Sequence, residues 1–384
     1  MNDYTELRLL DKVVLIDYLT VNIDDFRVVK WGKNDYRIQD DKFEALAQLL
    51  GYIPEAKNMQ YEPGLHSFTN GLRIGQFIRV NYGGEHVKSH GRYVVSIELS
   101  GQACREFEKH SGHTWLELFR MIFSFESFRV SRLDFAIDDF KGTEISLPYI
   151  RNLVEQGLYT SNSRLGSHVS SWKKNSDELV TAGYTIYIGA KGGNQLAIYD
   201  KLRERLSAGH EVDTECWNRY EMRFVQEKAY AVLEHYYLAL ETSKDFDFKQ
   251  LVQALLLDFM DLKDPNDKNS RIRRKATDPR WLMFLESVSK IDIEKRIKEP
   301  PSLEKKFKWF NNSMGSTMTE LILAKDFHGM QRVIYESILD AIDTLDSKKL
   351  SRINEYMKEH ENDAVDDDRL AQVKNMIKSI LDLD

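Results

Sequence analysis

Charged and phenolic side chains recur on one face of segments that alternate like β-strands. In Arg132–Asp139, apolar residues occupy every second position, and Asp134 and Asp138 share the intervening phase with Arg132. Because successive side chains of a strand point to opposite faces, both aspartates are expected on the same face. Aspartate is depleted in strand interiors, so this departure from the local rule indicates a functional or strained site.

Two later segments show the same pattern. In Gln195–Lys201, Leu196 and Ile198 point one way and Gln195, Ala197, Tyr199 and Lys201 point the other way. In Trp217–Phe224, one phase holds Tyr220, Met222 and Phe224, and the opposite phase holds Arg219, Glu221 and Arg223. If the three strands are neighbours, one sheet surface gathers carboxylates, a phenol and cations. The polar phases of the two later segments contribute Tyr199, Lys201, Arg219, Glu221 and Arg223.

This set of groups suits phosphoryl transfer. Carboxylates are hard oxygen ligands for Mg²⁺ or Mn²⁺, which would polarise a phosphodiester oxygen. Arginines can hold the remaining phosphate oxygens bidentately, and a tyrosine can attack once a base or a metal assists its ionisation. Two plainer interpretations stay open. The polar face of a half-exposed antiparallel sheet can simply be hydrated, and Asp134 and Asp138 can form ion pairs with Arg132 or Arg219.

The secondary structure that must position these groups changes along the chain from mixed strands and helices to helices alone. Up to about residue 225, β-type alternation dominates, with helices between the strands, capped at Thr114 and Ser146. After Gln226 nearly every segment has helical periodicity. We therefore predict an α+β fold, in which an open antiparallel sheet flanked by helices forms residues 1–245 and a helical C-terminal domain forms 246–384. The expected strands are Val13–Val21, Arg73–Tyr82, Tyr93–Leu99, Phe128–Phe140, Tyr184–Gly189, Gln195–Asp200 and Trp217–Phe224.

Composition limits the class of protein. The net charge is −7, so a nucleic-acid partner would be held by local patches rather than by bulk charge. Two cysteines exclude a disulfide scaffold, and no apolar run is long enough to cross a membrane, so we expect a cytoplasmic protein. The basic runs Lys268–Lys275, which includes Arg271, Arg273 and Arg274, and Lys305–Lys308 are either a solvated surface or a phosphate-contacting arm.

The ordered motifs resemble a known family. Arg132–Asp139, Tyr187–Lys191, Ile198–Lys201 and Trp217–Glu221 are similar to the signature segments of the Rep_trans superfamily. That superfamily contains rolling-circle plasmid replication initiators and the MobT-class relaxases of integrative conjugative elements. The segments Ile16–Thr20 and Ser100–Glu108 resemble the relaxase branch. The resemblance spans roughly residues 13–245.

The resemblance implies a fold like that of the HUH nickases, although no His-hydrophobe-His motif is present, and a metal-dependent, strand-specific DNA nick at an origin. It implies Tyr199 as nucleophile, with Glu221 and Lys201 assisting, and Asp134, Asp138 and Glu221 around Mg²⁺ or Mn²⁺. Relatives carry an arginine shortly before the nucleophile, where this chain has Leu196-Ala197, and Lys191 is the candidate replacement. The expected DNA contacts are Arg132, Lys191, Arg219, Arg223, Arg271, Arg273 and Arg274.

The expected partner is origin DNA, as a duplex or a hairpin with a single-stranded nick site. A host helicase, a conjugative coupling protein and a second copy of the chain are compatible partners, and a membrane is not. The rival interpretation is an origin-binding protein without nuclease chemistry. Two other patterns are weak: Cys104, His110 and His113 lack a fourth zinc ligand, and Lys191-Gly192-Gly193 lacks the spacing of a nucleotide-binding loop.

Overall fold

The computed structural model describes residues 11–53, 58–175, 178–243, 245–286, 288–289, 323–324, 329, 331–342, 345, 347–359 and 365–381. The chain forms two compact units, Met1–Arg296 and Ile297–Asp384. This division lies further along the chain than the boundary after residue 245 that the sequence suggests. Helices α7 (Phe248–Phe259) and α8 (Pro279–Phe284) contribute buried residues to the core of the first unit.

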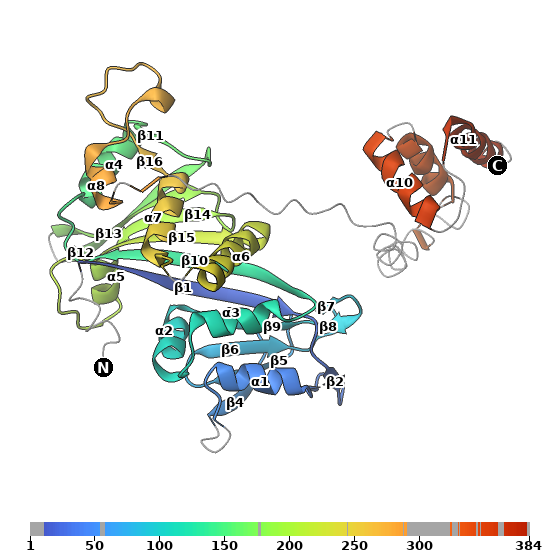
Figure 1. Ribbon diagram of the computed structural model, residues 1–384, viewed down its shortest axis with the longest axis horizontal. Helices are drawn as coiled ribbons and strands as arrows, with labels where there is room; N and C mark the ends of the chain where they lie inside the picture. Colours follow the sequence, from blue (N-terminus) through green and yellow to red (C-terminus); the bar gives the residue numbers. More distant parts are fainter. Residues whose placement is uncertain are drawn as a thin grey trace. The chain divides into compact units, whose positions relative to one another are not determined.

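A ten-stranded sheet organises the first unit, and all its neighbouring strands are antiparallel (Figure 1). The open antiparallel sheet predicted from the sequence is therefore confirmed. Its strands, in spatial order, are β12 (Gly166–Asn175), β13 (Glu178–Gly189), β14 (Gln195–Asp200), β15 (Asn218–Val225), β10 (Phe128–Asp139), β1 (Lys12–Ile23), β9 (Val95–Leu99), β6 (Ile78–Tyr82), β5 (Asn70–Ile74) and β4 (Met59–Pro63). Short pairs lie outside this sheet: β2 (Val28–Lys30) with β3 (Tyr36–Ile38), β7 (Lys88–Ser89) with β8 (Arg92–Tyr93), and β11 (Tyr159–Thr160) with β16 (Asp261–Leu262).

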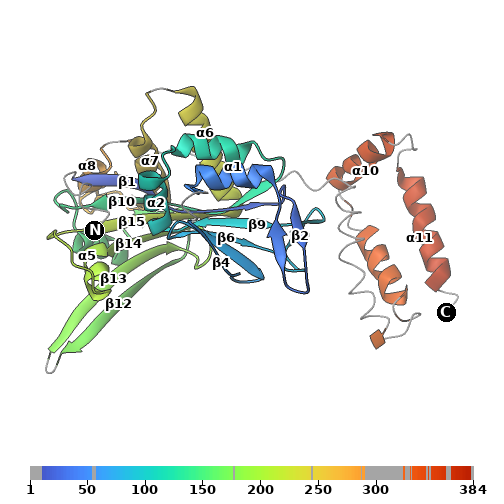
Figure 2. The ribbon, with the colours of Figure 1, turned by 90° about the horizontal axis from the view of Figure 1, so that it is seen from below.

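Most helices of this unit pack on one face of the sheet, which we call the core face (Figure 2). One continuous cluster joins the apolar phase of the central strands, such as Phe135 and Met222, to the apolar sides of these helices. The opposite face, called the polar face, carries the charged phase of the strands and helix α5 (Lys201–Ser207). The helices of the core face are α1 (Asp41–Leu49), α2 (Gly101–His110), α3 (Trp115–Phe123), α4 (Leu147–Glu155), α6 (Gln226–Thr242), α7 and α8.

Local signals explain where several helices begin. The Thr114 side chain accepts a hydrogen bond from the backbone N–H of Glu117, and Glu117 accepts one from the N–H of Thr114. This reciprocal pair satisfies donors at the helix start that would otherwise lack partners. Ser146 caps α4, with Pro148 in its first turn. Both capping predictions are therefore confirmed.

Some expected elements differ from the structure. The segment predicted as one strand, Arg73–Tyr82, folds into the hairpin β5–β6, because Gly75 adopts a positive φ of 64° that reverses the chain. Strand β12 was not predicted. Its sequence is mostly serine, lysine and other polar residues, so it lacks the apolar alternation that marks a half-buried strand.

The second unit is helical where it is described. It contains the helix 331–342 and helices α10 (Ser347–Glu359) and α11 (Asp367–Leu381). The basic run Lys305–Lys308 and the aromatic residues near it lie outside the described residues. In the described part of the chain, no helix is both long and apolar enough to cross a membrane.

Candidate active site

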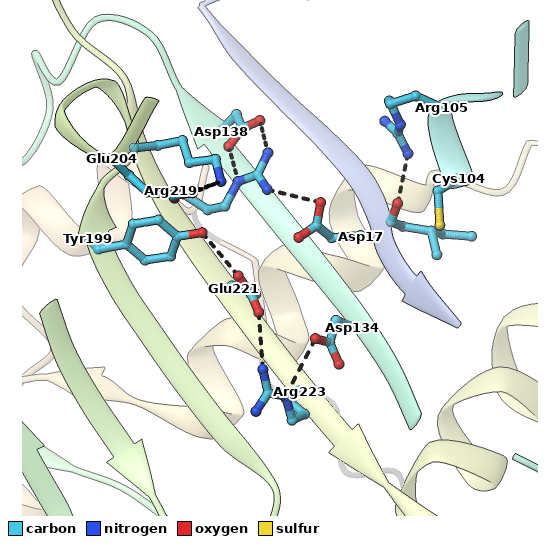
Figure 3. A network of polar contacts seen from close by, with 12 residues as sticks. Asp17, Cys104, Arg105, Asp134, Asp138, Tyr199, Glu204, Arg219, Glu221 and Arg223 are labelled. Carbon is cyan, nitrogen blue, oxygen red and sulfur yellow. Dashed lines mark hydrogen bonds and ion pairs between the residues drawn. The ribbon is translucent and has the colours of Figure 1, made fainter. Parts of the chain in front are cut away.

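The register of three central strands brings the predicted groups together on the polar face. Glu221 of β15 lies between Ala136 of β10 and Ala197 of β14 in the ladder. Two alanines leave space beside the carboxylate, so the larger Tyr199 side chain from β14 can reach it. The Tyr199 hydroxyl donates a hydrogen bond of 3.1 Å to Glu221 Oε2 (Figure 3).

Burial determines the protonation of this pair. Burial raises the pKa of Tyr199 well above its ordinary value; the nearby Glu221 charge adds to that rise, and Arg219 opposes it. The pKa of Glu221 is also raised, first by burial and then by the negative charges of Asp17 and Asp134. A carboxylate with a raised pKa is a stronger base, and here it already accepts the phenolic hydrogen bond.

Arg219 and Asp138 form a buried ion pair beside the tyrosine. Arg219 Nε and Nη2 each lie 2.7 Å from an oxygen of Asp138, and Nη1 lies 2.9 Å from Asp17 Oδ1. The side chains of Arg219 and Asp138 are 2% and 0% exposed. The structure therefore places Arg219, an expected DNA contact, where a DNA phosphate cannot reach it. Asp138, an expected metal ligand, has both oxygens bound to this arginine.

Asp17 is a residue of the site that the sequence analysis did not select. The pairing of β1 with β10 shifts between Ile16 and Tyr18, so Asp17 is the extra residue of a β-bulge and its side chain reaches Arg219 on the polar face. The backbone of the bulge is held from α2, because Arg105 Nη2 donates to the Ile16 carbonyl at 2.7 Å. The sequence feature that could have identified it is an aspartate within the otherwise mostly apolar segment Val13–Val21.

A second group of charges surrounds Asp134. Arg132 donates to both oxygens of Asp134, with Nε at 2.9 and 3.0 Å, and Arg223 Nε lies 3.5 Å from the same carboxylate. Arg223 Nη2 is also 3.5 Å from Glu221 Oε1. Burial raises the pKa of Asp134, although Arg132 opposes the rise. Unlike Arg219, Arg132 and Arg223 remain 28% and 29% exposed, so a ligand on this face can reach them.

The donor chemistry fits a divalent cation, but not with the predicted ligand set. Asp134 and Asp138 are four residues apart on one strand, which separates them by about 13 Å at 3.3 Å per residue. The negative charges of Asp17 and Asp134 both raise the pKa of Glu221, so these three carboxylates lie close enough to interact electrostatically. Within the described ranges, no three acidic, histidine or cysteine side chains are gathered at metal-site spacing. The acids are instead arranged as ion pairs with arginines.

A cleft of about 900 Å³ opens on the polar face beside Tyr199. Its floor is formed by β13 and β14, and one wall by α5. Glu221, Arg223 and Lys191 line it together with Tyr199. The Lys191 side chain is exposed in the turn that joins β13 to β14, where Gly193 N–H donates to the Ala190 carbonyl. The interpretation of this glycine pair as a turn is confirmed.

The remaining predicted residues lie at the edge of the site or outside it. Lys201 begins α5, its Nζ lies 5.6 Å from the centre of the Tyr199 ring, and it pairs with Glu204 at 2.7 Å. Arg271, Arg273 and Arg274 are exposed in the segment between β16 and α8, and none of them lines the cleft.

Comparison with known proteins agrees with this geometry. The family model described as "Replication initiation factor", Rep_trans, matches residues 128–338. The chain is 27% identical over 269 residues to the Bacillus subtilis (strain 168) protein named "Putative DNA relaxase NicK", covering 68% of this chain and 72% of that protein. The solved rolling circle replication initiator protein from Geobacillus stearothermophilus has the same fold, with a TM-score of 0.58 and 23% identity over 74% of this chain and 100% of that one. Because the family model matches more than half of the chain, the protein belongs to the Rep_trans family of replication initiation factors, and the resemblance of its motifs is confirmed.

Proposed function

We propose that the protein nicks and rejoins one DNA strand at an origin, with Tyr199 as the nucleophile. The observation that carries the proposal is the Tyr199–Glu221 hydrogen bond at the edge of an open cleft that Arg223 and Lys191 also line. Membership of a replication initiation family and similarity to a protein named as a relaxase support the same activity.

The residues divide the chemical step between them. Glu221 accepts the phenolic proton as the Tyr199 oxygen bonds to phosphorus, and it then releases that proton to solvent. The bond between phosphorus and the 3′ oxygen breaks, and that oxygen takes a proton from solvent to become a free hydroxyl. Arg223 is reachable from the cleft and can hold a non-bridging phosphate oxygen. The tyrosyl phosphodiester keeps the bond energy of the original linkage, so the strand can be rejoined.

A divalent cation completes the proposal. Asp17, Asp134 and Glu221 would hold it, and Mg²⁺ or Mn²⁺ would stabilise charge that develops on the phosphate oxygens. Asp138 has no part in this set, because Arg219, which binds both its oxygens, is only 2% exposed, whereas Arg132, which binds both oxygens of Asp134, is 28% exposed. We expect chelation of divalent ions to stop adduct formation and added Mn²⁺ or Mg²⁺ to restore it.

The test is a covalent adduct assay with a labelled oligonucleotide that carries the nick site. We expect Tyr199→Phe to bind the DNA and form no adduct, whereas the matched control Tyr187→Phe, altered in another tyrosine that lines the cleft, keeps forming it. An adduct that survives Tyr199→Phe removes this tyrosine from the role. Cleavage without attached protein would indicate a nuclease that uses water, and binding without any cleavage would indicate an origin-binding protein.

Duplex origin DNA is proposed to contact the exposed Arg271, Arg273 and Arg274. Each phosphate contact contributes about 0.9 to the slope of log affinity against log salt concentration. Replacing all three with alanine should therefore lower that slope by about 2–3 for duplex DNA, as fluorescence anisotropy at several salt concentrations would show. An unchanged slope would assign this basic segment to the solvated surface. The adduct assay on a saturating short oligonucleotide should not change.

A further inference from the structure

The bulge in β1 also determines where Tyr18 lies. After the bulge, the pairing of β1 with β10 continues with Tyr18 opposite Asp134 and Thr20 opposite Arg132. The next residue of β1, Leu19, is buried in the main core, so Tyr18 points to the polar face. Tyr18 therefore lies within the group of charges that surrounds Asp134.

The aromatic ring of Tyr18 packs against the guanidinium of Arg132. The Cζ atom of Arg132 lies 3.8 Å from the centre of the ring. This is well within the distance of about 6 Å at which a cation and an aromatic ring attract each other, and a planar guanidinium can stack on such a ring. The ring therefore restricts where the Arg132 side chain can lie.

The Tyr18 ring is itself held at its hydroxyl end. The hydroxyl donates a hydrogen bond to Glu98 Oε1 of β9, the next strand of the sheet. Burial raises the pKa of Tyr18, and the hydrogen bond to Glu98 raises it further, so the phenol stays protonated near neutral pH. Glu98, Tyr18 and Arg132 thus form a chain of contacts across the neighbouring strands β9, β1 and β10.

Arg132 keeps hydrogen-bonding capacity for a ligand. In the described part of the chain, its hydrogen bonds leave from Nε and Nη2 and go to Asp134, and Nη1 donates none. The side chain is 28% exposed. It lies next to the cleft, since Nη2 is 4.0 Å from Oε1 of Glu221, which lines the cleft with Tyr199. An arginine in this position is suited to a phosphate.

A purely structural explanation is that Arg132 only neutralises Asp134. Arg223 also contacts that carboxylate, at 3.5 Å, so Asp134 has a second cation beside it. Stacking on Tyr18 adds nothing to this charge balance. It does fix the guanidinium before any ligand binds, so that less side-chain freedom is lost when a ligand binds.

We propose that Arg132 forms a second phosphate subsite, for the phosphate next to the scissile one, and that Tyr18 is the residue that positions it. The inference rests on the proposed nicking function and deepens it. Arg223 holds the scissile phosphate from the cleft, and Arg132 holds the neighbouring phosphate of the same single strand. Both guanidinium groups contact the carboxylate of Asp134, which places them side by side on the polar face.

The first experiment measures the affinity of the full chain for a single-stranded oligonucleotide that carries the nick site, in the Tyr199→Phe background. Arg132→Gln should bind about ten- to 140-fold more weakly, which corresponds to about 1.5–3 kcal/mol for a hydrogen bond to a charged group at 1.4 kcal/mol per tenfold. Tyr18→Leu and Tyr18→Met, which lack an aromatic face, should lose about two- to 30-fold, or about 0.5–2 kcal/mol. Tyr18→Phe keeps the ring and should stay within about twofold of the unmodified residue.

The second experiment tests whether the ligand of Arg132 is a phosphate. Each phosphate contact contributes about 0.7 to the slope of log affinity against log salt concentration for a single strand, so Arg132→Gln should lower the slope by about that amount. A neutral methylphosphonate at one of the two positions next to the nick should weaken binding when Arg132 is present and have no further effect on Arg132→Gln. A structural role alone would change neither result.

Tyr61→Leu is the matched control. The Tyr61 ring also lies against an arginine, at 5.2 Å from Arg37 Cζ, but it belongs to β4 at the far edge of the sheet. Its loss should leave the affinity and the salt slope unchanged. In the adduct assay, Tyr18→Leu should raise the KM for the oligonucleotide and leave kcat unchanged, as expected for a contact that is the same before and during the chemical step.

Three results would overturn the inference: unchanged affinity in Arg132→Gln, a loss of affinity with an unchanged salt slope, or Tyr18→Leu and Tyr18→Met chains that bind as tightly as the unmodified one. The binding measurements do not depend on cleavage. If Tyr199→Phe kept forming an adduct, the proposed nucleophile would be wrong, while affinities measured with a chelator present would still test the subsite.

Discussion

Replacing Asp138 with alanine should destabilise the first unit severely, because it removes one half of a buried ion pair. Asp138 and Arg219 are both almost fully buried, and two 2.7 Å hydrogen bonds join them. Without the aspartate, Asp17, at 2.9 Å, is the one carboxylate partner that the guanidinium keeps among the residues that the structure describes. A buried charge without its partner cannot recover the hydration that it lost on folding.

The size of the effect follows from this arrangement. Breaking a buried pair by removing one partner costs about 3–5 kcal/mol, and the remaining Asp17 contact places this case near the lower end. With a urea m-value of about 3 kcal/mol/M, a loss of about 3 kcal/mol lowers the unfolding midpoint by about 1 M. That is a large part of the roughly 5–15 kcal/mol by which domains are stable.

The assay is urea unfolding followed by tryptophan fluorescence, with Glu221→Gln as the matched control. Glutamine keeps an oxygen that can accept the Tyr199 hydrogen bond, and it removes a carboxyl group whose pKa burial has raised. We expect its midpoint to move by less than about 0.3 M, while its rate of adduct formation falls by about 10²–10⁴, as for loss of a general base. A midpoint for Asp138→Ala within that same margin would refute the structural role of the pair and reopen its assignment as a metal ligand.

The site makes two further predictions. Burial, Asp17 and Asp134 raise the pKa of Glu221, so Glu221 loses its base form as the pH falls through a value above the ordinary glutamate range. The rate of adduct formation should decline at that pH. The residual rate of Glu221→Gln should show no such decline. Gly101→Ala should also slow adduct formation in a single-turnover assay, because its new Cβ would lie 2.9 Å from Asp17 Oδ1 and displace the carboxylate from Arg219. A rate equal to that of the unmodified chain would show that the position of Asp17 does not matter.

Alternation predicted the polar face well because it depends only on strand geometry. The bounds of β14 match the expected Gln195–Asp200, and Tyr199 and Glu221 lie on the same face, as their phases require. Alternation does not show which strands lie next to each other in the sheet. The contact between Tyr199 and Glu221 needs β14 beside β15 in a register that places small residues on both sides of the acid.

Asp17 shows why one residue of the site was missed. A single inserted residue reverses the face that the side chains of a strand occupy. Before the bulge, Val13 and Leu15 belong to a small apolar cluster with Ala136 of the polar face, while after it Leu19 and Val21 enter the main core. Val13, Leu15, Leu19 and Val21 all occupy odd positions, so the spacing of the apolar residues does not show that the strand changes face between them. Asp17 is the one sign of this change in the segment.

Asp134 and Asp138 look equivalent in sequence, but in the structure their arginine partners differ in how far they are exposed. Both lie opposite an arginine of β15 in the ladder, Arg223 and Arg219 respectively. Arg219 is 2% exposed, near the ring of Trp217 and bound to two acids, so its pair is closed to ligands. Arg223 remains 29% exposed at the cleft. We therefore expect a phosphate that enters the cleft to compete with Asp134 and Glu221 for Arg223 and to leave Asp138 untouched, so that Asp138 serves stability and Asp134 lies beside the phosphate.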